Sequence, residues 1–253
     1  MRELIKQSLK DSRVEPYARW LVKRSRGIPM PFDLVKNEIY DRQAFEIIRR
    51  VLAPDANCVD VGCHEGLFLE EFLRCAPRGR HFAFEPIPML ADLLKTKFPT
   101  VKIFPFALGN CVGETTFYVI PEALALSGLN PRVFVEPAKG REGINVRMER
   151  LDNLIPEGTK IDLLKIDVEG AEGMVIQGAL EIIRRDKPYI IFEHGRASSM
   201  ALGFSSERLY DLLVGECGLR LSSLRSWLHG ESVLSNARFG EPGEWYFLAH
   251  PNK

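Results

Sequence analysis

The stretch that decides the fold of this chain is Cys58-Val59-Asp60-Val61-Gly62-Cys63-His64-Glu65-Gly66. Its β-branched residues predict a short buried strand, and the apolar residues after it recur at helical spacing. Gly62 and Gly66 mark the turn between strand and helix, where missing side chains let the backbone approach a ligand. A dinucleotide site needs the tighter Gly-x-Gly-x-x-Gly spacing around its pyrophosphate. The looser spacing here favours a nucleoside-like ligand that carries no phosphate.

A second predicted strand ends in a carboxylate. The segment Arg80-His81-Phe82-Ala83-Phe84-Glu85-Pro86 reads as a strand, and Glu85 lies about 20 residues beyond the glycine turn, where a ribose-binding acid belongs. A carboxylate there accepts hydrogen bonds from both vicinal hydroxyls of a ribose. The alternative is that Glu85 only caps the turn after its strand. The two signals together favour a site for S-adenosylmethionine (SAM).

Composition limits the class of protein. A chain of 253 residues with 45% hydrophobic content can bury one sizeable α/β core. Basic and acidic residues both number 34, so the net charge gives no attraction to nucleic acid or membrane. No apolar run approaches the roughly 20 residues that span a bilayer, and the five cysteines are scattered without metal-ligand spacing. We therefore expect a cytoplasmic protein without a nucleic-acid partner and without stable membrane insertion.

Predicted strands and helices alternate along the chain. After a basic N-terminal arm (1–40), Asp41 is a candidate cap for a helix that ends before Pro54. Strands are predicted at 59–61, 81–85, 101–106, 161–167 and 189–193, with helices between them that include 171–184. Strand candidates at 114–120 and 144–150 flank a long loop, 121–143, that we interpret as a lid over the substrate; the alternative is a disordered surface hairpin. A helix at 206–216 and late strands at 220–224 and 245–249 complete the chain.

This order predicts an α/β fold of the Rossmann-like, doubly wound type, with a mostly parallel sheet and an antiparallel edge. One domain would cover 41–253, with a lid-like insertion at about 112–150. In such sheets ligands bind beyond the carboxyl ends of the strands, where the winding reverses. That rule selects a set of residues from five strand ends: Asp60, Gly62, His64, Gly66, Glu85, Ala107, Leu108, Gly109, Asn110, Asp167, Glu169, Gly170, Glu193 and His194.

Several motifs match one family. They are Asp60–Gly66, Phe84-Glu85-Pro86, Leu151-Asp152, the segment from Asp162 to Glu172, and Phe192-Glu193-His194. On these motifs the chain resembles the FkbM-type SAM-dependent methyltransferases over about residues 57–195. It departs at Cys63-His64, where the family usually has Ala-Asn. The resemblance implies a class I methyltransferase fold, SAM as the cofactor, and methylation of a hydroxyl on a small-molecule natural product or a saccharide. It also implies cofactor contacts from a set of nine residues: Asp60, Gly62, His64, Gly66, Glu85, Pro86, Ala107, Leu108 and Asp167.

Methyl transfer from a sulfonium requires positioning above all, together with a base close to the acceptor hydroxyl. Asp167 and His194 are the predicted catalytic residues. The alternative for Glu169 and Glu172 is helix capping, and for His194 a buried supporting role. A site for Mg²⁺ or Mn²⁺ is an alternative for the oxygen-rich set Asp167, Glu169, Glu193 and His194. Nothing in the spacing requires a metal, and we predict none. Two other functions stay open: a SAM-binding partner subunit without catalysis, and a nucleic-acid methyltransferase, which the missing Asn/Asp-Pro-Pro-aromatic tetrapeptide disfavours.

Overall fold

The computed structural model describes residues 32–121, 124–130 and 142–252. The chain divides into two compact units, 1–42 and 43–253, and helix α3 (Phe32–Val51) runs across the division. The predicted helix start at Asp41 is wrong: α3 is continuous from Phe32, because no glycine or proline interrupts the chain before Pro54. Most of the predicted basic arm, residues 1–31, lies outside the described residues.

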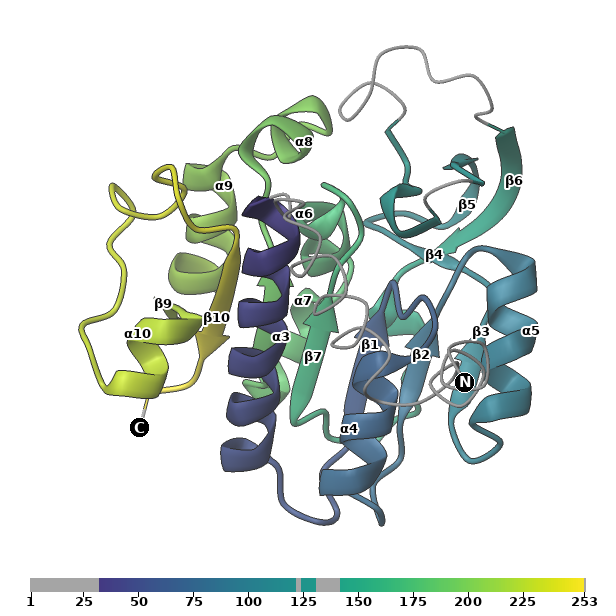
Figure 1. Ribbon diagram of the computed structural model, residues 1–253, viewed down its shortest axis with the longest axis horizontal. Helices are drawn as coiled ribbons and strands as arrows, with labels where there is room; N and C mark the ends of the chain where they lie inside the picture. Colours follow the sequence, from purple (N-terminus) through teal and green to yellow (C-terminus); the bar gives the residue numbers. More distant parts are fainter. Residues whose placement is uncertain (1–31, 122–123, 131–141, 253) are drawn as a thin grey trace, which may run out of the picture. The chain divides into compact units, whose positions relative to one another are not determined.

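The larger unit is built on a seven-stranded sheet with the order β3-β2-β1-β7-β8-β10-β9 (Figure 1). The first five strands in this order are parallel, and β10 is antiparallel to both of its neighbours. This confirms the predicted mostly parallel sheet with an antiparallel edge. The strands are β1 (Cys58–Val61), β2 (Phe82–Phe84), β3 (Lys102–Phe104), β7 (Leu163–Ile166), β8 (Tyr189–Glu193), β9 (Arg220–Ser223) and β10 (Tyr246–His250).

Helices cover both faces of this sheet. The winding proceeds in opposite directions from the β1–β7 boundary, and crossovers between parallel strands are right-handed. Helices α4 and α5 therefore cover one face, and α6 and α7 the other. The helices of this unit are α4 (Leu67–Cys75), α5 (Pro88–Lys97), α6 (Glu172–Gln177), α7 (Leu180–Asp186), α8 (Arg196–Ala201), α9 (Ser206–Tyr210), which continues as a π-helical turn (Asp211–Glu216), and α10 (Leu224–His229). Within the described residues, no helix combines the length and apolar character needed to cross a membrane.

The helix predicted at 171–184 is in fact two helices, α6 and α7, which meet at Gly178. A Cβ atom on Gly178 would lie 1.9 Å from the carbonyl oxygen of Gly109, so this close approach admits only glycine. The Asp152 carboxylate accepts hydrogen bonds from the backbone N–H groups of Glu181 and Ile182 in the first turn of α7. Asp152, part of the family motif, thus caps a separate second helix.

A second, three-stranded sheet interrupts the winding after β3. Its order is β4-β6-β5, from β4 (Ala107–Leu108), β5 (Gly113–Val119) and β6 (Glu142–Glu149). Between β5 and β6 lies the predicted lid, of which residues 122–123 and 131–141 are outside the described part. The described portion contains a short 3₁₀ turn (Leu124–Leu126) and is paired with β5 by a bridge between Tyr118 and Gly128. A second 3₁₀ turn (Leu151–Asn153) follows β6.

Candidate active site

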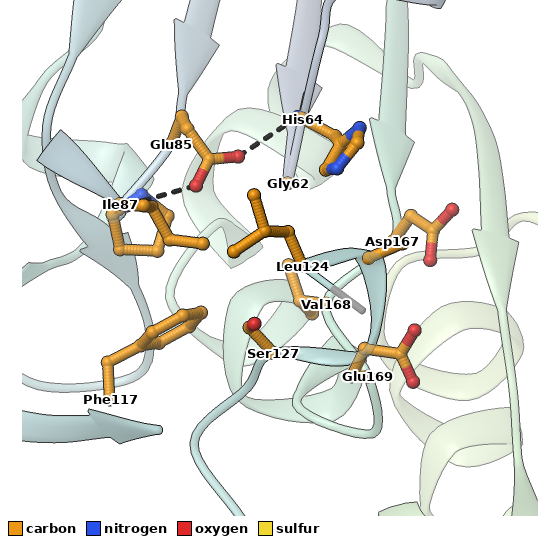
Figure 2. A pocket seen from close by; sticks show the side chains of 12 residues that line it. Gly62, His64, Glu85, Ile87, Phe117, Leu124, Ser127, Asp167, Val168 and Glu169 are labelled. Carbon is orange, nitrogen blue, oxygen red and sulfur yellow. Dashed lines mark hydrogen bonds between the residues drawn. The ribbon is translucent and has the colours of Figure 1, made fainter. Parts of the chain in front are cut away.

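A pocket lies beyond the carboxyl ends of β1, β2 and β7, beside the point where the winding reverses (Figure 2). With its open mouth included, its empty volume is about 400 Å³. The strand ends, the second sheet and the turn at 124–127 supply its lining: Gly62, His64, Glu85, Pro86, Ile87, Phe117, Leu124, Ala125, Ser127, Asp167, Val168 and Glu169. The structure thus brings five of the predicted cofactor residues together, namely Gly62, His64, Glu85, Pro86 and Asp167.

Glu85 is a buried carboxylate, only 4% exposed. Its Oε2 accepts a hydrogen bond from the His64 backbone N–H (2.9 Å), and its Oε1 accepts one from the Ile87 backbone N–H (3.0 Å). Burial raises the pKa of Glu85 to about 7, although the two N–H groups favour the ionised form. Each carboxylate oxygen has two acceptor positions, so each keeps capacity for one further donor. Capping the turn and binding two ligand hydroxyls are therefore compatible roles.

An apolar cavity adjoins this pocket and shares part of its lining. It is lined by Phe106, Ala107, Leu108 and Leu129, and by Phe117 from β5, with an empty volume of about 290 Å³. The predicted cofactor residues Ala107 and Leu108 lie here. A pocket that holds the buried Glu85 carboxylate, next to an apolar cavity, matches the chemistry of a nucleoside, whose ribose needs acceptors and whose base needs an apolar enclosure.

Gly62 and Gly66 are required by the protein's own packing. A Cβ on Gly62 would lie 1.9 Å from the Asp167 carbonyl oxygen, and one on Gly66 would lie 2.3 Å from the Phe98 ring. Both glycines have left-handed backbone conformations, with φ of 76° and 82°. Packing alone therefore requires glycine at both positions, and Gly62 in addition lines the pocket. Gly66 is not among the residues that line the pocket.

His64 occupies the position where the family usually has asparagine. Its φ is 47°, in the left-handed region, which asparagine and histidine adopt more readily than most residues. Its backbone N–H donates a hydrogen bond to the Glu85 carboxylate, and its side chain lines the pocket. The exchange of asparagine for histidine therefore keeps the backbone conformation that fixes Glu85.

Asp60 does not line the pocket. Its side chain is buried, and within the described part of the chain neither carboxylate oxygen has a hydrogen-bond partner. Burial raises the pKa of Asp60 to about 6, although the charge of Lys165, its register partner on β7, opposes the rise. The predicted direct contact between Asp60 and the cofactor is not part of this geometry.

Asp167 lies at the end of β7 within a network of donors. Its Oδ2 accepts hydrogen bonds from Lys165 Nζ (2.9 Å) and from Tyr246 Oη (2.5 Å). Glu193 shares a further hydrogen bond with it. Burial opposes ionisation, yet the charge of Lys165 and these hydrogen bonds hold the pKa of Asp167 below its usual range. Asp167 is thus a fixed anion, and 25% of its side chain is exposed.

Asp167, Glu169 and Glu193 form a carboxylate cluster in which one oxygen of each lies within 4.8 Å of the others. Burial and the neighbouring charges of Asp167 and Glu172 raise the pKa of Glu169 to about 8. Burial and the charge of Asp167 also raise the pKa of Glu193 well above its usual range. Hard cations bind oxygen-rich sets of this kind. Because Lys165 already supplies a positive charge to Asp167, we continue to expect no metal requirement.

Glu172 and His194 have supporting positions. The Oε1 of Glu172 accepts hydrogen bonds from the backbone N–H groups of Val168 and Gly170, so the predicted capping role fits Glu172. The His194 ring is 2% exposed, with Nδ1 3.1 Å from Ser199 Oγ and Nε2 2.8 Å from Ser206 Oγ. Burial lowers the pKa of His194 to about 4. Because His194 is outside the pocket lining and both its nitrogens are engaged, we withdraw it as a candidate base.

Three residues at or beside the pocket were not predicted from the sequence, namely Lys165, Tyr246 and Phe117. Lys165 had a usable signal, since a lysine inside the apolar strand Leu163–Ile166 needs a buried partner. Tyr246 had no signal in the sequence, because its approach to Asp167 depends on the insertion of β10 beside β8. Phe117 belongs to the second sheet, whose placement over the strand ends is a tertiary feature.

The residues present fit SAM. Glu85 offers two spare acceptors for the ribose hydroxyls, the Phe106 cavity suits the adenine, and the carboxylates of Asp167 and Glu169 lie across the pocket from Glu85 (Figure 2). The anionic Asp167 there complements the positive amino and sulfonium groups of the donor.

A doubly wound sheet with an antiparallel strand next to its edge, and a nucleoside-type pocket at the reversal of winding, defines the class I methyltransferase fold. The crystal structure of methyltransferase FkbM from Methylobacillus flagellatus has a similar fold, with a TM-score of 0.50 and 13% identity over 79% of this chain and 44% of that chain. The FkbM methyltransferase domain family matches residues 60–221. The chain belongs to this family.

Two curated relatives show how far the similarity extends. The chain is 28% identical over 219 residues to the AMB antimetabolite synthetase AmbE of Pseudomonas aeruginosa, covering 72% of this chain and 10% of AmbE. It is 27% identical over 157 residues to the 2-O-methyltransferase NoeI of Sinorhizobium fredii, covering 56% of this chain and 65% of NoeI. The chain thus spans about a tenth of one relative and just under two thirds of the other.

Proposed function

We propose that this protein transfers a methyl group from SAM to a hydroxyl of a small-molecule natural product or a saccharide. Membership of a methyltransferase family supports the reaction class. The similarity to NoeI, a 2-O-methyltransferase, supports oxygen as the methylated atom. The antimetabolite synthetase AmbE supports natural-product biosynthesis as the setting.

One observation carries the proposal: Glu85 presents a buried carboxylate with one spare acceptor position on each oxygen at the reversal of winding. Bound SAM would supply an already activated methyl group on its sulfonium. Glu85 would hold the two ribose hydroxyls, Phe106 and Leu108 would enclose the adenine, and the backbone of Gly62 would border the donor. The work of the chain is then to orient the donor and acceptor and to take one proton.

The first test is calorimetry with S-adenosylhomocysteine (SAH), the demethylated product, and we expect micromolar affinity. Glu85→Ala should weaken SAH binding by about 1.5–3 kcal/mol, as expected for hydrogen bonds to a charged group. Glu157→Ala, which removes an exposed carboxylate outside the pocket, is the control and should bind like the parent. Unchanged affinity in Glu85→Ala would remove Glu85 from the cofactor site.

The second test follows methyl-labelled SAM into a panel of hydroxylated natural products and saccharides, with tRNA and DNA as separate arms. Label in a hydroxylated compound supports the proposal. Label in nucleic acid would overturn the acceptor class. SAH binding without transfer to any arm would favour a partner subunit that binds SAM without catalysis.

A further inference from the structure

We propose that Glu169 is the general base that accepts the hydroxyl proton, and that Asp167 is a positioning residue that holds charge beside it. This inference rests on the proposed function. Glu169 lines the pocket, faces the same space as Asp167 (Figure 2), and lies within 4.8 Å of it at their carboxylate oxygens. A base must reach the acceptor oxygen from the pocket, and Glu169 is the pocket carboxylate whose oxygens are not committed elsewhere.

The hydrogen bonds of Asp167 argue against it as the base. Lys165 and Tyr246 both donate to its Oδ2, and Glu193 shares a hydrogen bond with it. A carboxylate stabilised by so many donors is a weak proton acceptor. Glu169, by contrast, has no hydrogen bond or ion pair within the described part of the chain.

The backbone at Glu169 is fixed in an unusual conformation. Its φ is 54°, in the left-handed region that a glutamate adopts only at a cost of about 1–2 kcal/mol. Glu172 holds this turn by accepting the N–H groups of Val168 and Gly170 on either side. Gly128, in the loop between β5 and β6, leaves space for the Glu169 side chain, since a Cβ atom on Gly128 would lie 3.1 Å from Glu169 Cβ. Strain of this kind, kept by surrounding bonds, is typical of functional positions.

Several charged groups set the protonation of Glu169. Asp167 and Lys165 act from β7, Glu172 from α6 and Glu193 from β8, while His64 lines the same pocket from the turn after β1. The charges of Asp167 and Glu172 outweigh that of Lys165 and favour the protonated form. Burial and these charges bring the pKa of Glu169 to about 8, close to working pH, where general bases are most effective.

The reaction balances with Glu169 ionised. The acceptor oxygen forms a bond to the methyl carbon as the carbon–sulfur bond breaks, and that electron pair returns to sulfur, giving the neutral thioether. The hydroxyl proton moves to the Glu169 carboxylate. A cation, a neutral alcohol and an anion thus become three neutral products, and the proton is then released to solvent.

The first test needs no acceptor. In full-length protein labelled with [δ-¹³C]glutamate, the carboxyl signal of Glu169 is identified by its loss in both Glu169→Gln and Glu169→Asp. Its titration midpoint is compared in the SAH and SAM complexes. A sulfonium within about 4–6 Å should lower the midpoint by about one pH unit or more. Equal midpoints in two saturated complexes would overturn the proposal, whereas absence of SAM and SAH binding in calorimetry would instead overturn the proposed function.

The second test measures turnover with the acceptor that the labelling screen identifies. Glu169→Gln should lower kcat about 10²–10⁴-fold while SAH affinity stays within a few fold, and Glu157→Gln is the matched control. In the parent, kcat/KM should rise with pH to a plateau above about pH 8, because the base must be ionised. This rise of kcat/KM with pH should be absent in Glu169→Gln and present in His64→Gln. If the rise were instead absent in His64→Gln and present in Glu169→Gln, the base would be His64 and the proposal would be overturned.

Discussion

At the scale of single residues, the pocket is shaped by contacts of the chain with itself before any ligand is considered. Gly62 shows this most directly, since the space for its Cβ is taken by the Asp167 carbonyl. The sequence pattern correctly marks the turn but cannot tell a glycine needed by a ligand from one needed by a neighbouring strand end.

Gly62→Ala should therefore destabilise the fold rather than only weaken ligand binding. We expect a loss of more than about 2 kcal/mol, from the left-handed backbone cost and the clash with Asp167. Gly158→Ala is the matched control, because Gly158 has the same φ of 76° and nothing within 4 Å of its Cβ position. Urea unfolding of both variants measures the difference. Equal losses would show that the Asp167 carbonyl moves aside easily.

The ionisation of Glu85 should control ligand affinity. Ribose hydroxyls donate to the ionised carboxylate, and burial places the pKa of Glu85 at about 7. SAH should therefore bind roughly tenfold more weakly at about pH 6 than at about pH 8, since only a tenth of Glu85 is ionised one unit below its pKa. Calorimetry across this range checks the effect, and Glu85→Gln should show a flat profile. A parent affinity independent of pH would contradict a role for the ionised form.

The strand ends predicted which residues gather at one edge of the sheet but not where each side chain points. Glu193 and His194 are adjacent, and successive side chains of an extended chain lie on opposite sides. Glu193 joins the carboxylate cluster, whereas His194 turns to Ser199 and Ser206. Glu85 was predictable because its position is set by backbone, at the end of a strand. The hydrogen bond from Tyr246 to Asp167 was not, because Tyr246 comes from a strand distant in sequence.

At the scale of elements, β10 connects the edge of the sheet to the pocket. Its insertion between β8 and β9 sets Tyr246 opposite Glu193 and brings its hydroxyl to Asp167. The sequence predicted two late antiparallel strands, but the choice of neighbour is made by tertiary packing. Gly178 makes the same point for helices, since helical spacing runs through it and its close approach to Gly109 is set by tertiary packing.

Tyr246→Phe should lower stability by about 1–2 kcal/mol at neutral pH, a discounted value for a hydrogen bond to a partly exposed carboxylate. The pKa of Asp167 is held low in the folded state, so this stabilisation exists above its unfolded pKa, about 3.9. It is lost as pH falls through the folded value. Urea unfolding at about pH 7 and at a series of pH values below about 3.9 should show the difference between variant and parent shrinking as Asp167 becomes protonated. Tyr118→Phe, whose hydroxyl has no partner within the described residues, is the control; an equal effect there would contradict the assignment.

At the scale of the whole molecule, the larger unit gathers carboxyl groups that burial makes hard to ionise. The pKa values of Asp60, Glu85, Glu169 and Glu172 are raised to about 6, 7, 8 and 7. In the unfolded chain these groups ionise near pH 4. The folded protein therefore binds more protons than the unfolded chain over this range, so its stability must fall as pH rises. Burial lowers the pKa of His194 and of His81, which opposes this trend only below their unfolded value of about 6.5.

Thermal unfolding of the ligand-free protein should therefore have a lower midpoint at about pH 8 than at about pH 6.5, where the histidines no longer compete. A drop of at least roughly 2–4 °C is expected, the shift that 1 kcal/mol produces in a domain of this size. Glu172→Gln removes one of the buried ionisable groups, whose Oε2 has no partner in the described part of the chain, and should flatten the dependence. Glu157→Gln, the exposed control, should leave the pH dependence of the midpoint unchanged. Saturating SAH should raise the midpoint more at pH 8 than at pH 6.5, because binding favours ionised Glu85. A midpoint that is constant or rises with pH would show that the pocket carboxyl groups are already ionised without ligand.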